Sequence, residues 1–220
     1  MKKQIYILIG FFCMIITSCS DNQIRVACVG DSITQGAASS DWGNKSYVAL
    51  LANKLGKKYD VRNFGLSGTT AGSNTYLPYD QTQQFEDAKN FKPNIVTIAL
   101  GTNDSQPDVW NTGDFAKNFE KDLINICEQF EVLNPTPKIY LCIPIPIILS
   151  DRWKHQPEVL SNEIIPKIKK IAKNKGYEVI DLYTPFIGKK EYYPSDDMLH
   201  PNDLGHQKIA DLIYDKLIEK

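Results

Sequence analysis

The hydrophobic pattern of this chain alternates between short β-rich runs and longer amphipathic segments, and this alternation limits the fold most strongly. The short runs favour five β-strands, at residues 24–29, 59–64, 95–100, 138–143 and 178–182. The amphipathic segments predict helices at 47–55, 81–90, 114–133, 158–174 and 204–218. Strands that alternate with helices in this way favour an α/β fold, in which helices cover both faces of a parallel sheet.

Composition is that of an ordinary globular protein, with 42% hydrophobic and 23% charged residues among 220. No Gly/Ser linker, internal repeat or low-complexity tract interrupts the chain after residue 23, so we expect a single domain over residues 24–220. The formal net charge is −1 and no Lys/Arg-rich run is present. Nucleic acid is therefore not an expected partner, because binding a phosphate backbone normally requires a basic surface.

The first residues have the pattern of an export signal. Lys2 and Lys3 precede an apolar run at 5–16, which is shorter than the roughly 20 residues needed to span a bilayer. The sequence Ile-Thr-Ser-Cys at 16–19 resembles a bacterial lipobox, whose cysteine becomes lipidated. We predict a lipoprotein signal peptide at 1–18, and a lipidated Cys19 with a short tether at 19–23. The exported protein would then be anchored to a membrane of the cell envelope, facing the periplasm or the cell surface.

The remaining cysteines favour a structural interpretation. Without Cys13 and the lipidated Cys19, three are left, which are Cys28, Cys127 and Cys142. An odd number cannot be fully paired, and Cys28 and Cys142 lie in apolar, strand-like runs. We expect all three to be small buried hydrophobic residues, in preference to a disulfide framework or a catalytic thiol.

Polar motifs follow several of the predicted strands. In open parallel sheets, ligands bind beyond the carboxyl ends of the strands. The motifs are Gly-Asp-Ser-Ile-Thr at 30–34, Gly-Leu-Ser-Gly at 65–68, Gly-Thr-Asn-Asp at 101–104 and Asp-Met-Leu-His at 197–200. We expect them to meet at one edge of the sheet.

A serine nucleophile needs a base, and the base needs an acid that orients it. Among the three histidines, only His200 has an acid at a useful short spacing, since Asp197 precedes it by three residues. His155 lies in a polar stretch without such an acid. His206 lies in the last amphipathic segment beside Lys208, where we expect a solvated surface position.

Taken in order, these four motifs resemble the sequence blocks of the SGNH hydrolases, also called GDSL esterases/lipases. The resemblance implies a three-layer α/β/α sandwich with a central, mostly parallel five-stranded sheet, the flavodoxin-like SGNH fold. It also implies Ser32 as nucleophile, His200 as general base and Asp197 as the orienting acid. The oxyanion hole would consist of the backbone N–H groups of Ser32 and Gly65 and the side-chain amide of Asn103.

Ser67 is the rival nucleophile, because it too lies in a glycine-flanked loop. Residues 65–68 do not form the Gly-x-Ser-x-Gly elbow of α/β-hydrolases, so a structural hydrogen bond is the expected role of Ser67. Asp31 has no neighbours at metal-ligand spacing, and no dinucleotide-binding or Walker-type loop is present. We therefore predict no metal and no cofactor.

Substrate choice is expected to depend on the loops. Trp42, Trp110 and Trp153 lie in predicted connections and are candidates for substrate binding, since aromatic rings stack on sugars or pack on acyl chains. No long apolar lid is present. The similarity to small secreted SGNH members implies a serine O-acetylesterase acting on glycans such as hemicellulose, pectin or sialic acid. The alternatives are a lysophospholipase or thioesterase, which a membrane tether would favour, and a catalytically silent glycan-binding module.

Overall fold

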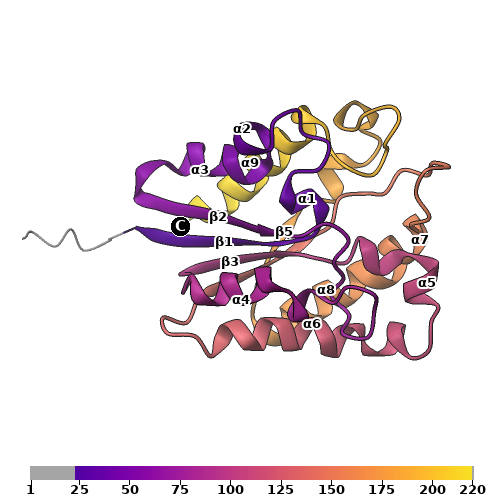
Figure 1. Ribbon diagram of the computed structural model, residues 1–220, viewed down its shortest axis with the longest axis horizontal. Helices are drawn as coiled ribbons and strands as arrows, with labels where there is room; N and C mark the ends of the chain where they lie inside the picture. The colour runs from indigo at the N-terminus through magenta and orange to yellow at the C-terminus, as the bar shows by residue number, and fades with distance from the viewer. Residues whose placement is uncertain (1–22, 220) are drawn as a thin grey trace, which may run out of the picture.

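The computed structural model describes residues 23–219, and these form a five-stranded, entirely parallel sheet in the order β2-β1-β3-β4-β5 (Figure 1). The strands are β1 Ile24–Gly30, β2 Tyr59–Gly65, β3 Ile95–Ala99, β4 Lys138–Ile143 and β5 Glu178–Asp181. Each lies within one residue of its predicted bounds. The predicted signal peptide and Cys19 lie outside the described residues and stay predictions.

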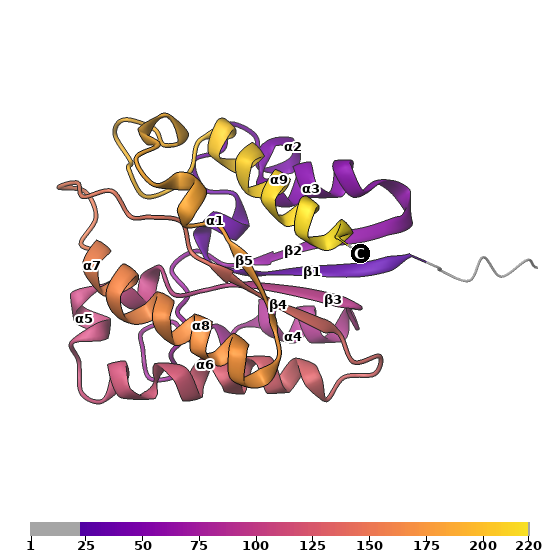
Figure 2. The ribbon, with the colours of Figure 1, turned by 180° about the vertical axis from the view of Figure 1, so that it is seen from behind.

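Helices cover both faces of the sheet, so the three-layer architecture is confirmed (Figures 1 and 2). One layer contains α3 (Tyr47–Leu55) and α9 (Asp203–Ile218), and the other contains α4 (Gln83–Asn90), α6 (Phe115–Glu131) and α8 (Ile165–Lys175). Strand β1 shows how the layers form. Successive side chains of a strand point to opposite faces, so Val26 and Cys28 enter one core, and Ala27 and Val29 enter the other.

The helices follow the apolar periodicity of the sequence. Every third or fourth residue of α6 is buried, namely Phe115, Phe119, Leu123, Ile126 and Phe130. The predicted helix at 158–174 is a composite of α7 (Pro157–Val159), a π-helical turn (Leu160–Ile164) and α8. The remaining short elements were not predicted; they are α1 Ser32–Gln35, α2 Trp42–Lys45, α5 Pro107–Trp110, and the 3-10 helices Gly56–Lys58, Tyr79–Gln81, Asn103–Ser105, Thr184–Phe186 and Lys190–Tyr192.

The surface position predicted for His206 is wrong. Its side chain is fully buried where α9 packs against α3. The ring Nδ1 accepts the backbone N–H of Tyr47 at 3.2 Å, and Nε2 donates to the carbonyl oxygen of Ala37 at 3.0 Å. His206 therefore joins three segments of the chain. The nearby Lys208 did not indicate this burial, because residues two positions apart on a helix face different directions.

The prediction for the cysteines is confirmed, because Cys28, Cys127 and Cys142 are free and buried. Burial raises the pKa of the Cys28 and Cys127 thiols to about 12, which keeps them protonated. Within residues 23–219, no helix is long and apolar enough to cross a membrane.

Candidate active site

Ser32 lies directly beyond the carboxyl end of β1, as the first residue of α1. Asp31 caps this short helix, since its Oδ1 accepts the N–H of Ile33 at 2.9 Å. The serine is 6% exposed, so its hydroxyl is partly enclosed. As at the start of any helix, the backbone N–H of Ser32 points away from the helix and is available to a ligand.

His200 and Asp197 meet Ser32 at this edge. The Ser32 Oγ lies 2.9 Å from His200 Nε2, and His200 Nδ1 lies 3.0 Å from both carboxylate oxygens of Asp197. His200 lies 168 positions after Ser32 in the sequence, and Asp197 lies close to His200. Only the tertiary fold brings the pair to the serine. The three side chains form the serine, imidazole and carboxylate series that transfers a proton away from a nucleophile.

The environment of Asp197 keeps its carboxylate ionised. Partial burial works against this, but the backbone N–H groups of His200 and Leu199 donate to Asp197 Oδ1 at 2.9 and 3.0 Å. Together with the His200 ring, these bonds lower the pKa of Asp197 below its usual value. An ionised Asp197 places the ring proton of His200 on Nδ1, so that Nε2 is free to accept the proton of Ser32.

Asn103 lies in the 3-10 helix that follows β3, and both ends of its amide are held. Its Nδ2 donates to the carbonyl oxygen of Thr69 at 2.9 Å, and its Oδ1 lies 3.1 Å from His155 Nε2. Since the amide oxygen only accepts, His155 must carry its proton on Nε2. These contacts fix the direction of the amide and leave one Nδ2 hydrogen for a ligand.

His155 is the main functional residue that the sequence did not reveal. It is 7% exposed, and its Nδ1 is buried without a hydrogen-bond partner among residues 23–219. Burial, followed by the nearby His200, lowers the pKa of His155 to about 4, so the ring is neutral at ordinary pH. No spacing in the sequence indicates the contact between His155 and Asn103. The loop after β4 folds back to reach Asn103, and the Gln156 N–H donates to the carbonyl oxygen of Ser105 at 3.2 Å.

The structure does not support Gly65 as an oxyanion donor. Its N–H donates to Asn63 Oδ1 at 2.9 Å, so it is not available to a substrate. A Cβ at Gly65 would lie 2.3 Å from the backbone nitrogen of Gln35, so glycine is needed here for the close packing of β2 against α1. Gly68, three residues later, lines the same cleft as Ser32 and Asn103, and no acceptor within residues 23–219 takes its N–H.

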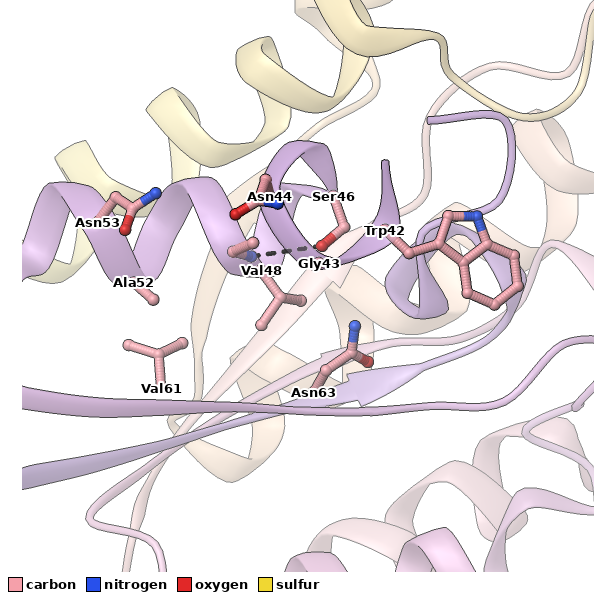
Figure 3. A pocket seen from close by; sticks show the side chains of 10 residues that line it. Trp42, Gly43, Asn44, Ser46, Val48, Ala52, Asn53, Val61 and Asn63 are labelled. Atoms are coloured by element: carbon pink, nitrogen blue, oxygen red, sulfur yellow. Dashed lines mark hydrogen bonds between the residues drawn. The ribbon is translucent and has the colours of Figure 1, made fainter. Parts of the chain in front are cut away.

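Of the three candidate tryptophans, only Trp153 lies at this cleft. Its ring packs edge-on against His200 with centroids 5.1 Å apart, and its Nε1 donates to Asp197 Oδ1 at 3.1 Å. Trp110 is 4% exposed and packs in the core against Phe115 and Phe119, so the substrate-binding prediction for it is wrong. Trp42 is exposed, but it lines a separate groove between α3 and β2 (Figure 3).

The cleft around Ser32 has a volume of about 350 Å³. Its wall contains the partly charged loop at 152–155 and the exposed Tyr76, whose hydroxyl accepts a hydrogen bond from Gln106 at 2.9 Å. Ser67 also lines the cleft, and its backbone N–H donates to Gln35 Oε1 at 3.0 Å. The imidazole contacts Ser32 and not Ser67, which favours Ser32 as the nucleophile.

Two buried carboxyl groups support the loops beneath the cleft. Asp104 accepts the backbone N–H groups of Ala71 and Gly72 at 3.1 and 3.0 Å, and burial raises its pKa to about 6. Burial likewise raises the pKa of Asp31 to about 7. Within residues 23–219, no three His, Cys, Asp or Glu side chains come together in a way that could hold a metal ion.

Comparisons with known proteins place the chain in a family. The model of the GDSL-like lipase/acylhydrolase family matches residues 28–208. An acetylxylan esterase of Xylanibacter ruminicola is 35% identical over 210 residues, which is 88% of this chain and 43% of that protein. The chain thus spans less than half the length of this relative.

Solved structures share the fold. An acetyl xylan esterase superposes with a TM-score of 0.69 at 24% identity, covering 89% of this chain and all of that one. A lipase/acylhydrolase from Enterococcus faecalis gives a TM-score of 0.68 at 21% identity, covering 88% of this chain and 94% of that one. At these identities the likeness shows the fold alone. The matched family model and the acetylxylan esterase relative show that the chain belongs to the GDSL-like lipase/acylhydrolase family.

Proposed function

We propose that this protein removes acetyl groups from an acetylated xylan or a closely related glycan, through an acyl-enzyme formed on Ser32. The observation that carries the proposal is the 2.9 Å contact of Ser32 Oγ with His200 Nε2, while Nδ1 of the same ring is held by Asp197. The choice of an acetylated glycan is supported by the 35% identity with an acetylxylan esterase.

In the proposed first step, Ser32 Oγ forms a bond to the carbonyl carbon of the ester, and its proton passes to His200 Nε2. The carbonyl oxygen becomes negative in the tetrahedral intermediate. When this intermediate collapses, the bond to the sugar oxygen breaks and that oxygen takes the proton from His200. Water then attacks the acetyl group on Ser32 by the same route, which releases acetate and restores the serine.

We propose that three donors stabilise the negative oxygen of this intermediate. We assign them as the backbone N–H of Ser32, the backbone N–H of Gly68 and Nδ2 of Asn103. Gly68 replaces Gly65 in this assignment because the Gly65 N–H is already bonded to Asn63. The loss of one such donor typically lowers kcat by about 10²- to 10³-fold.

The cleft favours a short acyl group with a polar alcohol over a long acyl chain. At about 350 Å³ it lies near the lower end of the usual range for ligand sites, and Gln106, Arg152 and Lys154 contribute polar side chains to its wall. A long acyl chain would extend beyond this volume and leave much of its apolar surface against water. This argues against a lysophospholipase or thioesterase.

The proposal is tested by measuring kcat/KM for 4-nitrophenyl acetate and 4-nitrophenyl laurate, together with acetate release from acetylated xylan. We expect the acetyl ester to be hydrolysed at least tenfold faster than the lauroyl ester, and acetate to be released from the glycan. A preference for laurate would support the lipid-directed alternative. Binding of xylan without hydrolysis of any ester would instead support a silent glycan-binding module.

A further inference from the structure

A second concavity, which we call the Trp42 groove, lies along the outer side of the edge strand β2 (Figure 3). It has a volume of about 380 Å³ and shares no lining residue with the cleft around Ser32. Residues of α2, α3 and β2 form it, among them Trp42, Asn44, Asn53, Val61 and Asn63. The groove is therefore a separate surface, which the proposed chemistry leaves without a role.

The chemistry of the Trp42 groove suits an uncharged, hydroxyl-rich ligand. None of its lining side chains is charged. The Trp42 side chain is 54% exposed and presents a broad apolar ring beside the groove, as Figure 3 shows. The amide of Asn53 makes no hydrogen bond to any residue within 23–219, so it can both donate and accept. An aromatic face together with a free amide is a combination that can bind a sugar ring, whose C–H face is apolar and whose hydroxyls form hydrogen bonds.

The groove and the cleft lie at opposite ends of α1. Ser32, the first residue of this helix, lines the cleft, whereas a Cβ at Gly36, directly after it, would lie 3.4 Å from Trp42 Cγ. Four helical residues span only about 6 Å. Asn63, in the groove, donates from Nδ2 to the carbonyl oxygen of Thr34 at 2.8 Å. The distance between the two sites is therefore within the reach of a single oligosaccharide.

We propose that the Trp42 groove binds unreacting sugar units of the glycan whose acetyl ester lies in the cleft. This inference rests on the proposed function, because it assumes a polymeric carbohydrate substrate. Contacts away from the reacting ester supply binding energy that only a substrate long enough to reach them can use. Trp42 would therefore contribute to the hydrolysis of the polymer and not to that of a small ester.

The first test is calorimetric titration of the wild-type protein and of Trp42→Ala with an unacetylated xylo-oligosaccharide. This ligand carries no ester, so the result does not depend on catalysis. We expect measurable binding by the wild type and at least tenfold weaker binding by Trp42→Ala. The matched control is Val132→Ala, which removes a side chain that is 82% exposed at a different surface site. Equal binding by Trp42→Ala and the wild type, or no binding by the wild type, would overturn the inference.

The second test compares kcat/KM of the same proteins on acetylated xylan and on 4-nitrophenyl acetate. For Trp42→Ala we expect about a tenfold loss on the polymer and no change on the small ester. Equal losses on both substrates would mean that Trp42 supports the cleft itself, and the inference would fail. If the wild type binds the oligosaccharide through Trp42 but releases no acetate from xylan, the proposed function fails while the groove stands as a sugar-binding site.

Discussion

The cleft around Ser32 and the Trp42 groove are similar in volume, at about 350 and 380 Å³, yet they differ in chemistry. The cleft brings together a hydroxyl, an imidazole and an amide from the ends of three segments of the chain. The groove has an uncharged lining and a single exposed indole. The size of a concavity therefore does not indicate where a reaction takes place, whereas the convergence of donors and acceptors does.

The largest expected effect is a loss of ester hydrolysis at the cleft without a loss of oligosaccharide binding at the groove. Ser32→Ala removes the nucleophile, and we expect kcat on 4-nitrophenyl acetate to fall by at least about 10³-fold. Binding of the xylo-oligosaccharide by calorimetry should stay unchanged, because the groove is intact. Turnover close to that of the wild type would show that Ser32 is not the nucleophile, and Ser67→Ala would then be the next variant to measure.

A smaller effect is expected at His155, which acts on the cleft through Asn103. His155→Leu removes the donor to Asn103 Oδ1 and allows the amide to turn, so we expect kcat to fall about 10- to 100-fold with little change in KM. His155→Gln keeps an N–H donor at a similar reach, and we expect it to recover most of the loss.

The measurement is kcat and KM on 4-nitrophenyl acetate, with thermal unfolding as a control for folding. If the Leu and Gln variants lose activity equally, the hydrogen bond to Asn103 does not matter. If their activities follow their melting temperatures, His155 has only a structural role.

The cleft also differs from the groove in that it is built over buried carboxyl groups, and this predicts a pH dependence of stability. The pKa of Asp31 is raised to about 7, whereas an unfolded chain has an ordinary aspartate. Between about pH 4 and 7, the folded protein holds a proton on Asp31 that the unfolded chain has lost. This contribution to stability is full at low pH and declines as pH rises toward 7, by at most about 1.4 kcal/mol per pH unit.

Asp31→Asn carries no titrating group, so its free energy of unfolding should decline less steeply than that of the wild type. Urea unfolding at pH 5, 6 and 7 measures the two slopes. Some slope should persist in the variant, because the pKa of Asp104 is also raised, to about 6. Identical slopes would show that Asp31 is ionised throughout this range in the folded protein.

The order of strands and helices was predictable because it depends on local periodicity. Strand β1 is a short continuous apolar run, whereas helix α6 repeats its apolar residues every three or four positions, and both patterns can be recognised along the chain. The pair Asp197 and His200 was predictable for a similar reason, since the two residues lie three positions apart in one turn. The four sequence motifs added Ser32 and Asn103 through their resemblance to a family.

The predictions were wrong where the role of a residue depends on its contacts with other parts of the structure. Gly65 and Gly68 stand in the same short motif, and only the hydrogen bond from Gly65 to Asn63 shows that its N–H is already used. Trp110 resembles a loop aromatic in sequence, but it is covered by α6. His206 is buried by the packing of α9 against α3.

The sequence by itself determined the architecture and indicated the residues proposed for ester hydrolysis, because helix and strand periods and short motifs are local properties. Only the tertiary structure decided which groups are free to act. In the folded protein, the Gly65 N–H is bonded to Asn63, His155 contacts Asn103, and Trp42 lies in a groove apart from the cleft. The physical reason is that a donor, an acceptor or an aromatic face is available only if no partner from a distant segment already occupies it.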